Sequence, residues 1–307
     1  MTKKCIVLFS GGLDSRLVVE IMKEKGFEIL CVYFKLPFGG APENEVKEFI
    51  KKGLKVFDCT KGKLLQEYLK VVKTAKHGTG AGMNPCIDCK IFMFKKVKEF
   101  ADKKRIKFIV TGEVVGQRPM SQRKKQIELI EKESGLEERI IRPLIDLGIY
   151  GRQRKKQMAL AKKFKIKYPS PAGGCLLCEK FLKKRFEFLF KRGLKEEELV
   201  LVNIGRHFII NTASLRSRHK NLQAGSCWVV IGRNQQENEI LENLPLLVCP
   251  KLQNAGAELI VPDFIGPTAI LLDKQNKKII NKVKDLIKAY SKKGSEKEKK
   301  KFEEFKI

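Results

Sequence analysis

The stretch Ser10-Gly-Gly-Leu-Asp-Ser15 joins the short apolar run 5–9 to a helical pattern that begins near Ser15. Two glycines between a buried strand and a helix, Gly11 and Gly12, let the backbone approach a ligand closely, and N–H groups at a helix start attract an anion. Ser10 and Ser15 add hydroxyl donors, so phosphate is the expected guest, and Asp14 is suited to hold an accompanying Mg²⁺. No lysine follows, which excludes a Walker A loop; an ordinary strand-to-helix turn is the alternative interpretation.

The string SGGLDS after an N-terminal strand resembles the PP-loop of the ATP pyrophosphatases, which adenylate a substrate and release pyrophosphate. The resemblance implies that ATP is the cofactor and that its phosphates meet Ser10, Gly11, Gly12, Asp14 and Ser15. That superfamily contains tRNA-thiolating enzymes, tRNA lysidine synthetase, and asparagine, GMP and NAD synthetases. The loop therefore predicts a chemistry without predicting the acceptor.

Length and charge narrow the choice of partner. A chain of 307 residues with 43% hydrophobic content can bury one large core and still form a second domain. Sixty-four Lys and Arg against thirty-five Asp and Glu give a net charge of +29, which favours a polyanion, with nucleic acid the leading candidate. A thermophile surface is the competing explanation, but such surfaces usually balance lysine with glutamate.

The role of the cysteines depends on whether the protein resides in an oxidising or a reducing compartment. The chain has nine of them, lacks a signal-peptide pattern, and has no apolar run of the roughly eighteen residues that a membrane span needs, so a cytoplasmic protein with no membrane partner is expected. In a reducing compartment, paired cysteines suggest a metal, a cluster or redox chemistry before a structural disulfide.

Apolar runs at 5–9, 27–34, 54–59, 106–110 and 139–144 alternate with helical patterns, which predicts a doubly wound parallel α/β sheet. Ligands of such sheets bind beyond the carboxyl ends of the strands. Tyr33 and Phe34 end the second run, so they are candidates to border the adenine; simple packing under a helix is the alternative.

Two CxxC pairs lie about eighty residues apart. Cys86 and Cys89 follow a glycine-rich loop and open a helix, where the macrodipole and Lys90 favour thiolates. Cys175 and Cys178 end the loop Tyr168-Pro-Ser-Pro-Ala-Gly-Gly-Cys-Leu-Leu-Cys178, which prolines and glycines make rigid. A zinc site, an iron–sulfur cluster, a catalytic thiol pair and unrelated cysteines are the possible interpretations.

The segment Thr111–Gln122 resembles the TGE…GQ…SQ motif of tRNA 4-thiouridine synthetases. The resemblance implies that Gly112 and Gln122 border ATP, with Gln117 partly interchangeable with Gln122. It also implies a tRNA substrate and a sulfur donor, either sulfide or a persulfide-carrying protein. Relatives either carry persulfides or hold a 4Fe-4S cluster on three cysteines; we favour the cluster, with Cys86, Cys89 and Cys175 as its core ligands and Cys178 as a ligand or a spare.

The second half of the chain is rich in basic residues, and part of it resembles a second known family. Residues 147–192 contain fourteen Lys or Arg and two Glu, as a phosphate-contacting surface requires. The strings at 203–210 and 227–238 resemble the RNA-binding domain of the NFACT family and predict a small α+β module. Candidate phosphate contacts are Arg206, His207, Arg216, Arg218, His219, Lys220 and Arg233.

The expected organisation is a PP-loop domain (1–165), a cysteine-bearing basic connector (166–192), an NFACT-like RNA-binding domain (193–270) and a basic helical tail (271–307). The expected function is ATP-dependent tRNA thiolation: a uridine carbonyl oxygen is adenylated, and sulfur then displaces AMP to give 2- or 4-thiouridine. Asp14, Cys86, Cys89 and Cys175 are the expected catalytic residues. Adenylation of another tRNA base and a non-catalytic, ATP-binding RNA-binding factor are the alternatives.

Overall fold

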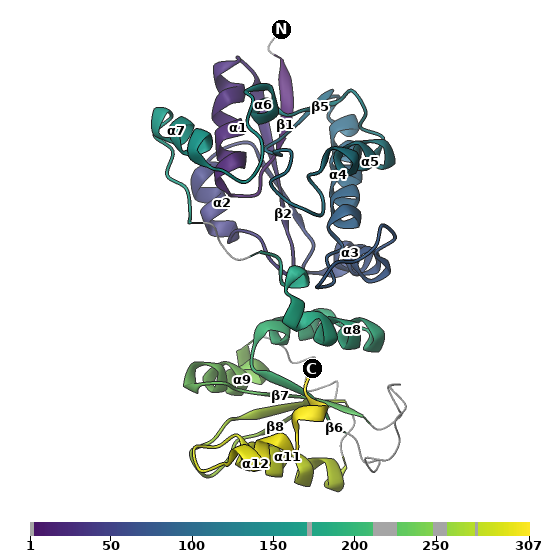
Figure 1. Ribbon diagram of the computed structural model, residues 1–307, viewed down its shortest axis with the longest axis vertical. Coiled ribbons are helices and arrows are strands. Elements are labelled where there is room, and N and C mark those ends of the chain that lie inside the picture. The colour runs from purple at the N-terminus through teal and green to yellow at the C-terminus, as the bar shows by residue number, and fades with distance from the viewer. Residues whose placement is uncertain (1–2, 171–173, 211–225, 248–256, 274–275) are drawn as a thin grey trace. The chain divides into compact units, whose positions relative to one another are not determined.

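The computed structural model describes residues 3–170, 174–210, 226–247, 257–273 and 276–307. The chain divides into two compact units, Met1–Lys183 and Lys184–Ile307, which Figure 1 colours along the sequence. Within the described ranges, no helix combines the length and the apolar character that crossing a membrane requires. The cytoplasmic location stays a prediction.

The first unit is built on a five-stranded parallel sheet in the order β3-β2-β1-β4-β5. Its central strand carries apolar residues on both faces because helices cover both sides, which is why the run preceding the glycine loop shows no polar alternation. This confirms the predicted doubly wound α/β fold. The strands are β1 (Lys4–Leu8), β2 (Glu28–Lys35), β3 (Leu54–Asp58), β4 (Phe108–Thr111) and β5 (Ile140–Ile141).

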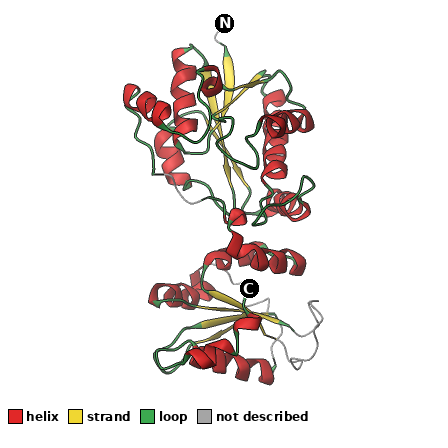
Figure 2. Cartoon of the chain, in the orientation of Figure 1, coloured by secondary structure: helices red, strands yellow, loops and turns green. Residues whose placement is uncertain are grey.

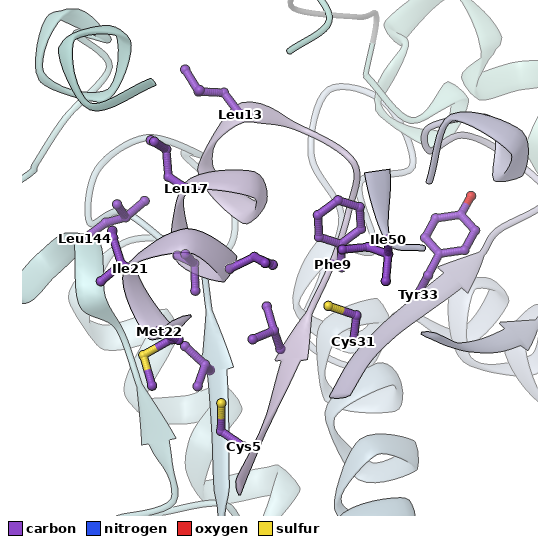
Figure 3. Packing of buried hydrophobic residues seen from close by; sticks show 14 of the residues in the cluster. Cys5, Phe9, Leu13, Leu17, Ile21, Met22, Cys31, Tyr33, Ile50 and Leu144 are labelled. Atoms are coloured by element: carbon purple, nitrogen blue, oxygen red, sulfur yellow. The ribbon is translucent and has the colours of Figure 1, made fainter. Parts of the chain in front are cut away.

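Helices form a layer on each face of this sheet (Figures 1 and 2). One layer contains α1 (Leu13–Glu24), α2 (Glu43–Phe49), α6 (Pro143–Asp146) and α7 (Lys155–Lys163); the other contains α3 (Gly62–Thr74), α4 (Cys86–Lys103) and α5 (Lys124–Ser134). Cys5 of β1 packs in one cluster with Leu17 and Met22 of α1 (Figure 3). The alternate strand residue Val7 belongs to the same cluster. Helix α5 was not anticipated from the sequence.

The second unit has a four-stranded antiparallel sheet in the order β6-β7-β9-β8, which confirms a smaller α+β domain. Buried Val283 and Leu286 of α11 pack against it. Its strands are β6 (Arg206–Ile210), β7 (Cys227–Ile231), β8 (Glu258–Ile260) and β9 (Ala269–Leu272), and its helices include α8 (Lys183–Arg192), α9 (Gln235–Leu247), α11 (Lys277–Ala289) and α12 (Glu296–Lys300).

The unit boundaries differ from those expected at residues 165, 192 and 270. Residues up to Lys183 belong to the first unit, because the backbone near the second CxxC pair bonds to it: Leu176 N–H donates to the Phe38 carbonyl at 2.7 Å. The expected tail is part of the second core, since β9 occupies an inner position of the sheet and α11 covers it. Apolar residues at helical spacing outweigh the lysines of that segment.

His207 was expected to contact phosphate, and the structure contradicts this because its ring is fully buried. Trp228 Nε1–H donates to His207 Nδ1 at 3.2 Å, so the proton lies on Nε2, 2.7 Å from the Ile204 carbonyl oxygen. Burial, together with the charge of Arg185, lowers the pKa of His207 to about 3. The imidazole is therefore a neutral structural group.

The second unit should lose stability on acidification. In the unfolded chain the imidazole has a pKa near 6.5 and binds a proton below that pH, whereas folded His207 stays neutral. The free energy of unfolding therefore falls as the pH drops below 6.5, by about 2 kcal/mol at pH 5. Trp228, the only tryptophan of the chain, is fully buried, so its fluorescence reports unfolding of this unit. In His207→Gln, the slope of the free energy of unfolding against pH should decrease by the equivalent of about one bound proton. An unchanged slope would contradict the neutral state assigned to His207.

Candidate active site

The glycine loop turns directly from β1 into α1, which begins at Leu13. Gly11 has φ +81°, and a Cβ there would lie 2.5 Å from Cβ of Ala41, so both the backbone conformation and the space require glycine. Ser10 Oγ–H donates to Ser15 Oγ at 3.3 Å, and Ser15 Oγ–H donates to the Gly12 carbonyl at 2.9 Å. The predicted loop residues thus form one hydrogen-bonded turn at the start of a helix.

Asp14 has one carboxylate oxygen held and one free. Gln117 Nε2–H donates to Oδ2 at 2.9 Å, whereas Oδ1 is buried and finds no hydrogen-bond partner among the described residues. Burial raises the pKa of Asp14, which the Gln117 hydrogen bond, the charges of Arg154 and Arg118, and the neighbouring Gln157 amide oppose. A buried, unpartnered carboxylate oxygen is suited to a cation ligand.

Gly112 brings the end of β4 against the loop. A Cβ on this residue would lie 2.8 Å from the carbonyl carbon of Asp14 and 3.0 Å from N of Ser15. Gln122 is buried, and its side-chain oxygen lacks a hydrogen-bond partner within the described ranges. Of the two glutamines that the sequence left interchangeable, Gln117 is therefore the one that contacts Asp14.

Three buried polar residues escaped the sequence analysis. Arg16 Nε–H donates to the Gly11 carbonyl and Nη1–H to the Lys167 carbonyl, both at 2.8 Å, and the guanidinium lies 4.6 Å from the Phe49 ring centre. Gln157 is fully buried with both amide atoms unpartnered. An arginine or glutamine on a helix is usually expected to be exposed to solvent, so only the tertiary packing shows that these two side chains are buried.

The third is Glu113, which follows Gly112. Its buried carboxylate pairs with Lys90 and, at 3.0 Å, with Arg142. Burial opposes its ionisation, yet Lys90 and Arg142 hold the pKa of Glu113 below its ordinary value. Lys90, expected to support the neighbouring thiolates, is thus committed to Glu113, and it braces β4 against the cysteine-bearing helix.

Phe34 lies at the end of β2 as expected, but its ring stacks on Phe57 at 5.0 Å between centres and is only 7% exposed. The packing alternative describes this ring well, and its contact with adenine stays a prediction. Tyr33 donates its hydroxyl to the Ala41 carbonyl at 2.5 Å.

The structure brings the two CxxC pairs together. Cys86 is the first residue of α4, and its sulfur lies 3.7 Å from that of Cys178. Asn84 N–H donates to the Leu177 carbonyl at 2.9 Å, which ties the two cysteine segments through their backbones. The sulfur of Cys89 lies 3.8 Å from the hydroxyl oxygen of buried Tyr68.

The surroundings of the thiols favour ionisation of Cys178 over that of Cys86 or Cys89. The hydrogen bond to Cys178 raises the pKa of Cys86, and burial raises that of Cys89 to about 11. Hydrogen bonds from Cys175 and Cys86 instead lower the pKa of Cys178 well below that of an ordinary thiol. Cys178, expected to be a ligand or a spare, thus lies within hydrogen-bonding distance of Cys86, and its role stays a prediction.

A glycine turn connects the phosphate loop to the cysteine group. Ala41 lies against Gly11, and Gly39, with φ +150°, lies against Cys175, whose Cα would be 3.0 Å from an added Cβ. The carboxyl ends of β1 and β2 therefore lead to two sites that one short turn links. Among the described residues, no three His, Cys, Asp or Glu side chains are arranged around a single metal position.

The candidate phosphate contacts of the second unit have different surroundings. Arg233 forms an ion pair with Glu237, and Arg192, from the basic segment, pairs with Glu198 at 2.8 Å and Asp273 at 2.6 Å. Arg206 forms no ion pair with a described carboxylate. The remaining candidates lie outside the described residues: Arg216, Arg218, His219 and Lys220.

Curated relatives match part of the chain. The chain is 29% identical over 120 residues to "tRNA-specific 2-thiouridylase MnmA" of Nitratiruptor sp., covering 36% of this chain and 35% of the relative. It is 28% identical over 149 residues to "Probable tRNA sulfurtransferase" of Thermococcus kodakarensis, covering 47% and 37%. The chain thus spans about a third of the length of these relatives.

Two solved structures are similar in part. One, described as "Crystal structure of a 4-thiouridine synthetase - RNA complex with bound ATP", has a TM-score of 0.41 and 20% identity over 65% of this chain and 52% of that chain. The other, a "predicted subunit of tRNA methyltransferase" from Methanocaldococcus jannaschii, has a TM-score of 0.39 and 20% identity over 60% and 89%. Such low scores carry no functional argument.

The family comparison covers the unit that holds the loop and the first cysteine pair. The family described as "Thiamine biosynthesis protein (ThiI)" matches residues 1–166, more than half of the 307 residues. The matched residues include the SGGLDS loop, Gly112 and the Cys86–Cys89 pair. The chain therefore belongs to the ThiI family.

Proposed function

We propose that this protein is an ATP-dependent tRNA sulfurtransferase that makes 2- or 4-thiouridine. The observation that carries the proposal is the group of four cysteines next to the turn that also packs on the phosphate loop. A uridine oxygen leaves poorly until it is adenylated, so the reaction needs a nucleotide loop and a sulfur site in one crevice. The relatives named for tRNA thiolation support this, and a net charge of +29 suits tRNA better than a small thiamine precursor.

The phosphate loop would bind ATP and expel pyrophosphate. Amides at the start of α1 and the hydroxyls of Ser10 and Ser15 would hold the phosphates, while Gly112 and Gln122 would border the nucleotide. The unpartnered Oδ1 of Asp14 fits Mg²⁺, which when bound would neutralise phosphate charge. Gln117 would orient this carboxylate, and Arg16 would keep the Gly11 carbonyl turned away from the anion.

The cysteine group would supply sulfur. Its thiol donors suit an iron–sulfur cluster, which Cys86, Cys89 and Cys175 would hold, and sulfide or a persulfide-carrying protein would be the donor. The described arrangement places no three of these side chains around one metal position, so no step is assigned to a cluster or to zinc. The persulfide alternative uses the 3.7 Å pair: a persulfide on Cys178 attacks the adenylated carbon, AMP leaves, and the Cys86 thiolate cleaves the S–S bond to release thiouridine and a Cys86–Cys178 disulfide for an external thiol to reduce.

The test is incubation of the protein with tRNA transcripts, ATP, Mg²⁺ and, in separate reactions, either sulfide or a persulfide-carrying protein with a thiol reductant, followed by mass spectrometry of the nucleosides. We expect thiouridine, AMP and pyrophosphate in equal amounts. AMP formation with a modified base other than a thiouridine would favour a different adenylating enzyme. ATP binding without turnover would favour a non-catalytic RNA-binding factor.

Gly39→Ala should separate the two half-reactions. The added Cβ would push on the Cα of Cys175 from 3.0 Å, while Asp14 and its Gln117 partner are untouched. We expect thiolation to fall about a hundredfold through misplacement of the sulfur site, with pyrophosphate release nearly unchanged. Gly26→Ala is the matched control, because Gly26 also has positive φ (+76°) but nothing within 4 Å of an added Cβ. Equal effects of the two substitutions would refute a specific role of Gly39.

A further inference from the structure

The second unit contains an open groove of about 440 Å³ that the thiolation chemistry does not use. Its walls are the loop 261–267 between β8 and β9, the segment that follows β7, and the end of α11 with the residues after it. Its volume lies within the roughly 300–1,000 Å³ of ordinary ligand sites. The groove is therefore large enough for a small molecule or for part of a polymer.

Apolar side chains project from one wall into water. Val261 is 55% exposed, Phe264 40% and Ile265 81%, all on the short loop 261–267 that contains Pro262 and Pro267. The Phe264 ring lies against Gly266, where an added Cβ would be 2.8 Å from Cε2, and much of the ring remains accessible. Exposed apolar groups gathered on a proline-restrained loop indicate recognition rather than folding.

The string Gly232-Arg-Asn-Gln-Gln-Glu-Asn238, singled out in the sequence, holds this loop in place. Asn238 Nδ2–H donates to the Gly266 carbonyl at 3.3 Å, and its Oδ1 accepts from Thr268 N–H at 3.1 Å. An added Cβ at Gly232 would lie 2.0 Å from that Oδ1, so only glycine leaves room for the clamp. The motif therefore builds the groove, and its arginine pairs with Glu237.

The residues that line the groove include more cations than carboxylates. The Arg206 guanidinium lies 5.3 Å from the Tyr290 ring centre, and neither it nor exposed Lys292 pairs with a described acidic residue. Of the acidic residues nearby, Glu237 pairs with Arg233 and Glu242 accepts a hydrogen bond from the Thr268 hydroxyl at 2.5 Å, whereas Asp263, on the loop itself, is exposed and forms no ion pair with a described residue. The surface thus presents positive charge next to an exposed aromatic ring, the combination that binds single-stranded nucleic acid.

We infer that this groove binds an unpaired segment of RNA, with a base stacked on Phe264 and the adjoining phosphates at Arg206 and Lys292. The inference rests on the proposed function only for its RNA partner. An acidic peptide would use the same cations, but it would not require the π-face of the ring. The rigid loop favours a base because stacking gains affinity without ordering a flexible side chain.

The test measures binding of a labelled, unstructured oligoribonucleotide of about ten residues to the full chain without ATP, against a duplex of the same length. Phe264→Ala and Phe264→Leu should each weaken single-strand binding about tenfold, whereas Phe264→Trp should retain it and duplex binding should not change. Arg206→Gln and Lys292→Gln should each lower the magnitude of the salt slope by about 0.7.

Controls keep the outcome specific. Phe181→Ala removes a 76% exposed phenylalanine from the first unit, and Lys284→Gln removes an exposed charge of α11; neither residue lines the groove, so the Phe264-dependent term should persist in both. Single-strand binding of Phe264→Leu equal to wild type would overturn the inference, as would stronger competition by oligoglutamate than by unlabelled RNA. If thiouridine never forms but Phe264-dependent binding does, only the proposed function fails.

Discussion

Asp14→Asn is expected to abolish release of pyrophosphate, by about a hundredfold or more, while the fold and tRNA affinity remain. The substitution keeps the shape of the side chain and leaves an oxygen available to Gln117. It removes the negative charge from a buried position whose Oδ1 finds no protein partner in the described structure. Without that charge the loop cannot hold Mg²⁺ against the phosphates. A pyrophosphate release assay with tRNA, ATP and Mg²⁺ measures the loss.

Asp146→Asn is the matched control, because Asp146 is exposed at the end of α6 and loses the same charge. It should behave as wild type. The rate of pyrophosphate release by Gln117→Ala should lie between those of Asp14→Asn and Asp146→Asn, because this substitution frees Oδ2 of Asp14 but leaves its carboxylate charged. Wild-type pyrophosphate release from Asp14→Asn would remove Asp14 from the catalytic machinery.

Cys86→Ser and Cys178→Ser are each expected to lower thiolation about a hundredfold or more, with adenylation intact. Their sulfurs are 3.7 Å apart, so each loses its partner when the other is replaced. From sequence alone Cys178→Ser should be mild; its lowered pKa and its place in the group make a severe loss the expectation now. Nucleoside mass spectrometry and pyrophosphate release, measured on the same samples, separate the two steps.

Iron content distinguishes the two sulfur mechanisms. A cluster predicts that Cys86→Ser, Cys89→Ser and Cys175→Ser each lose iron and thiolation together. A persulfide predicts an iron-free protein in which Cys89→Ser retains activity, because the Cys89 sulfur contacts the Tyr68 hydroxyl and is not one of the two sulfurs of the 3.7 Å pair. Cys5→Ala, in the core, is the control for removal of a thiol. Stoichiometric zinc with full activity in the native protein would make the cysteines structural.

The parallel sheet and the phosphate loop could be predicted from the sequence because both are local. Buried strands read as continuous apolar runs, and Gly11 marks a backbone conformation and a close approach that no other residue satisfies. Gly112 was identified by its resemblance to the 4-thiouridine synthetase motif, and the structure shows that its missing side chain admits the backbone of Asp14. The alternation of strands and helices then requires these residues to meet at the carboxyl edge of the sheet.

By itself, then, the sequence determined the fold class, the glycine loop with its acidic residue, and the presence of two cysteine pairs. Only the tertiary structure decided which groups touch, because such contacts join residues far apart in the chain. It joined Cys86 to Cys178, Gln117 to Asp14, and Lys90 to Glu113. It also buried His207, and the surroundings of this imidazole, rather than the intrinsic pKa of histidine, keep it neutral.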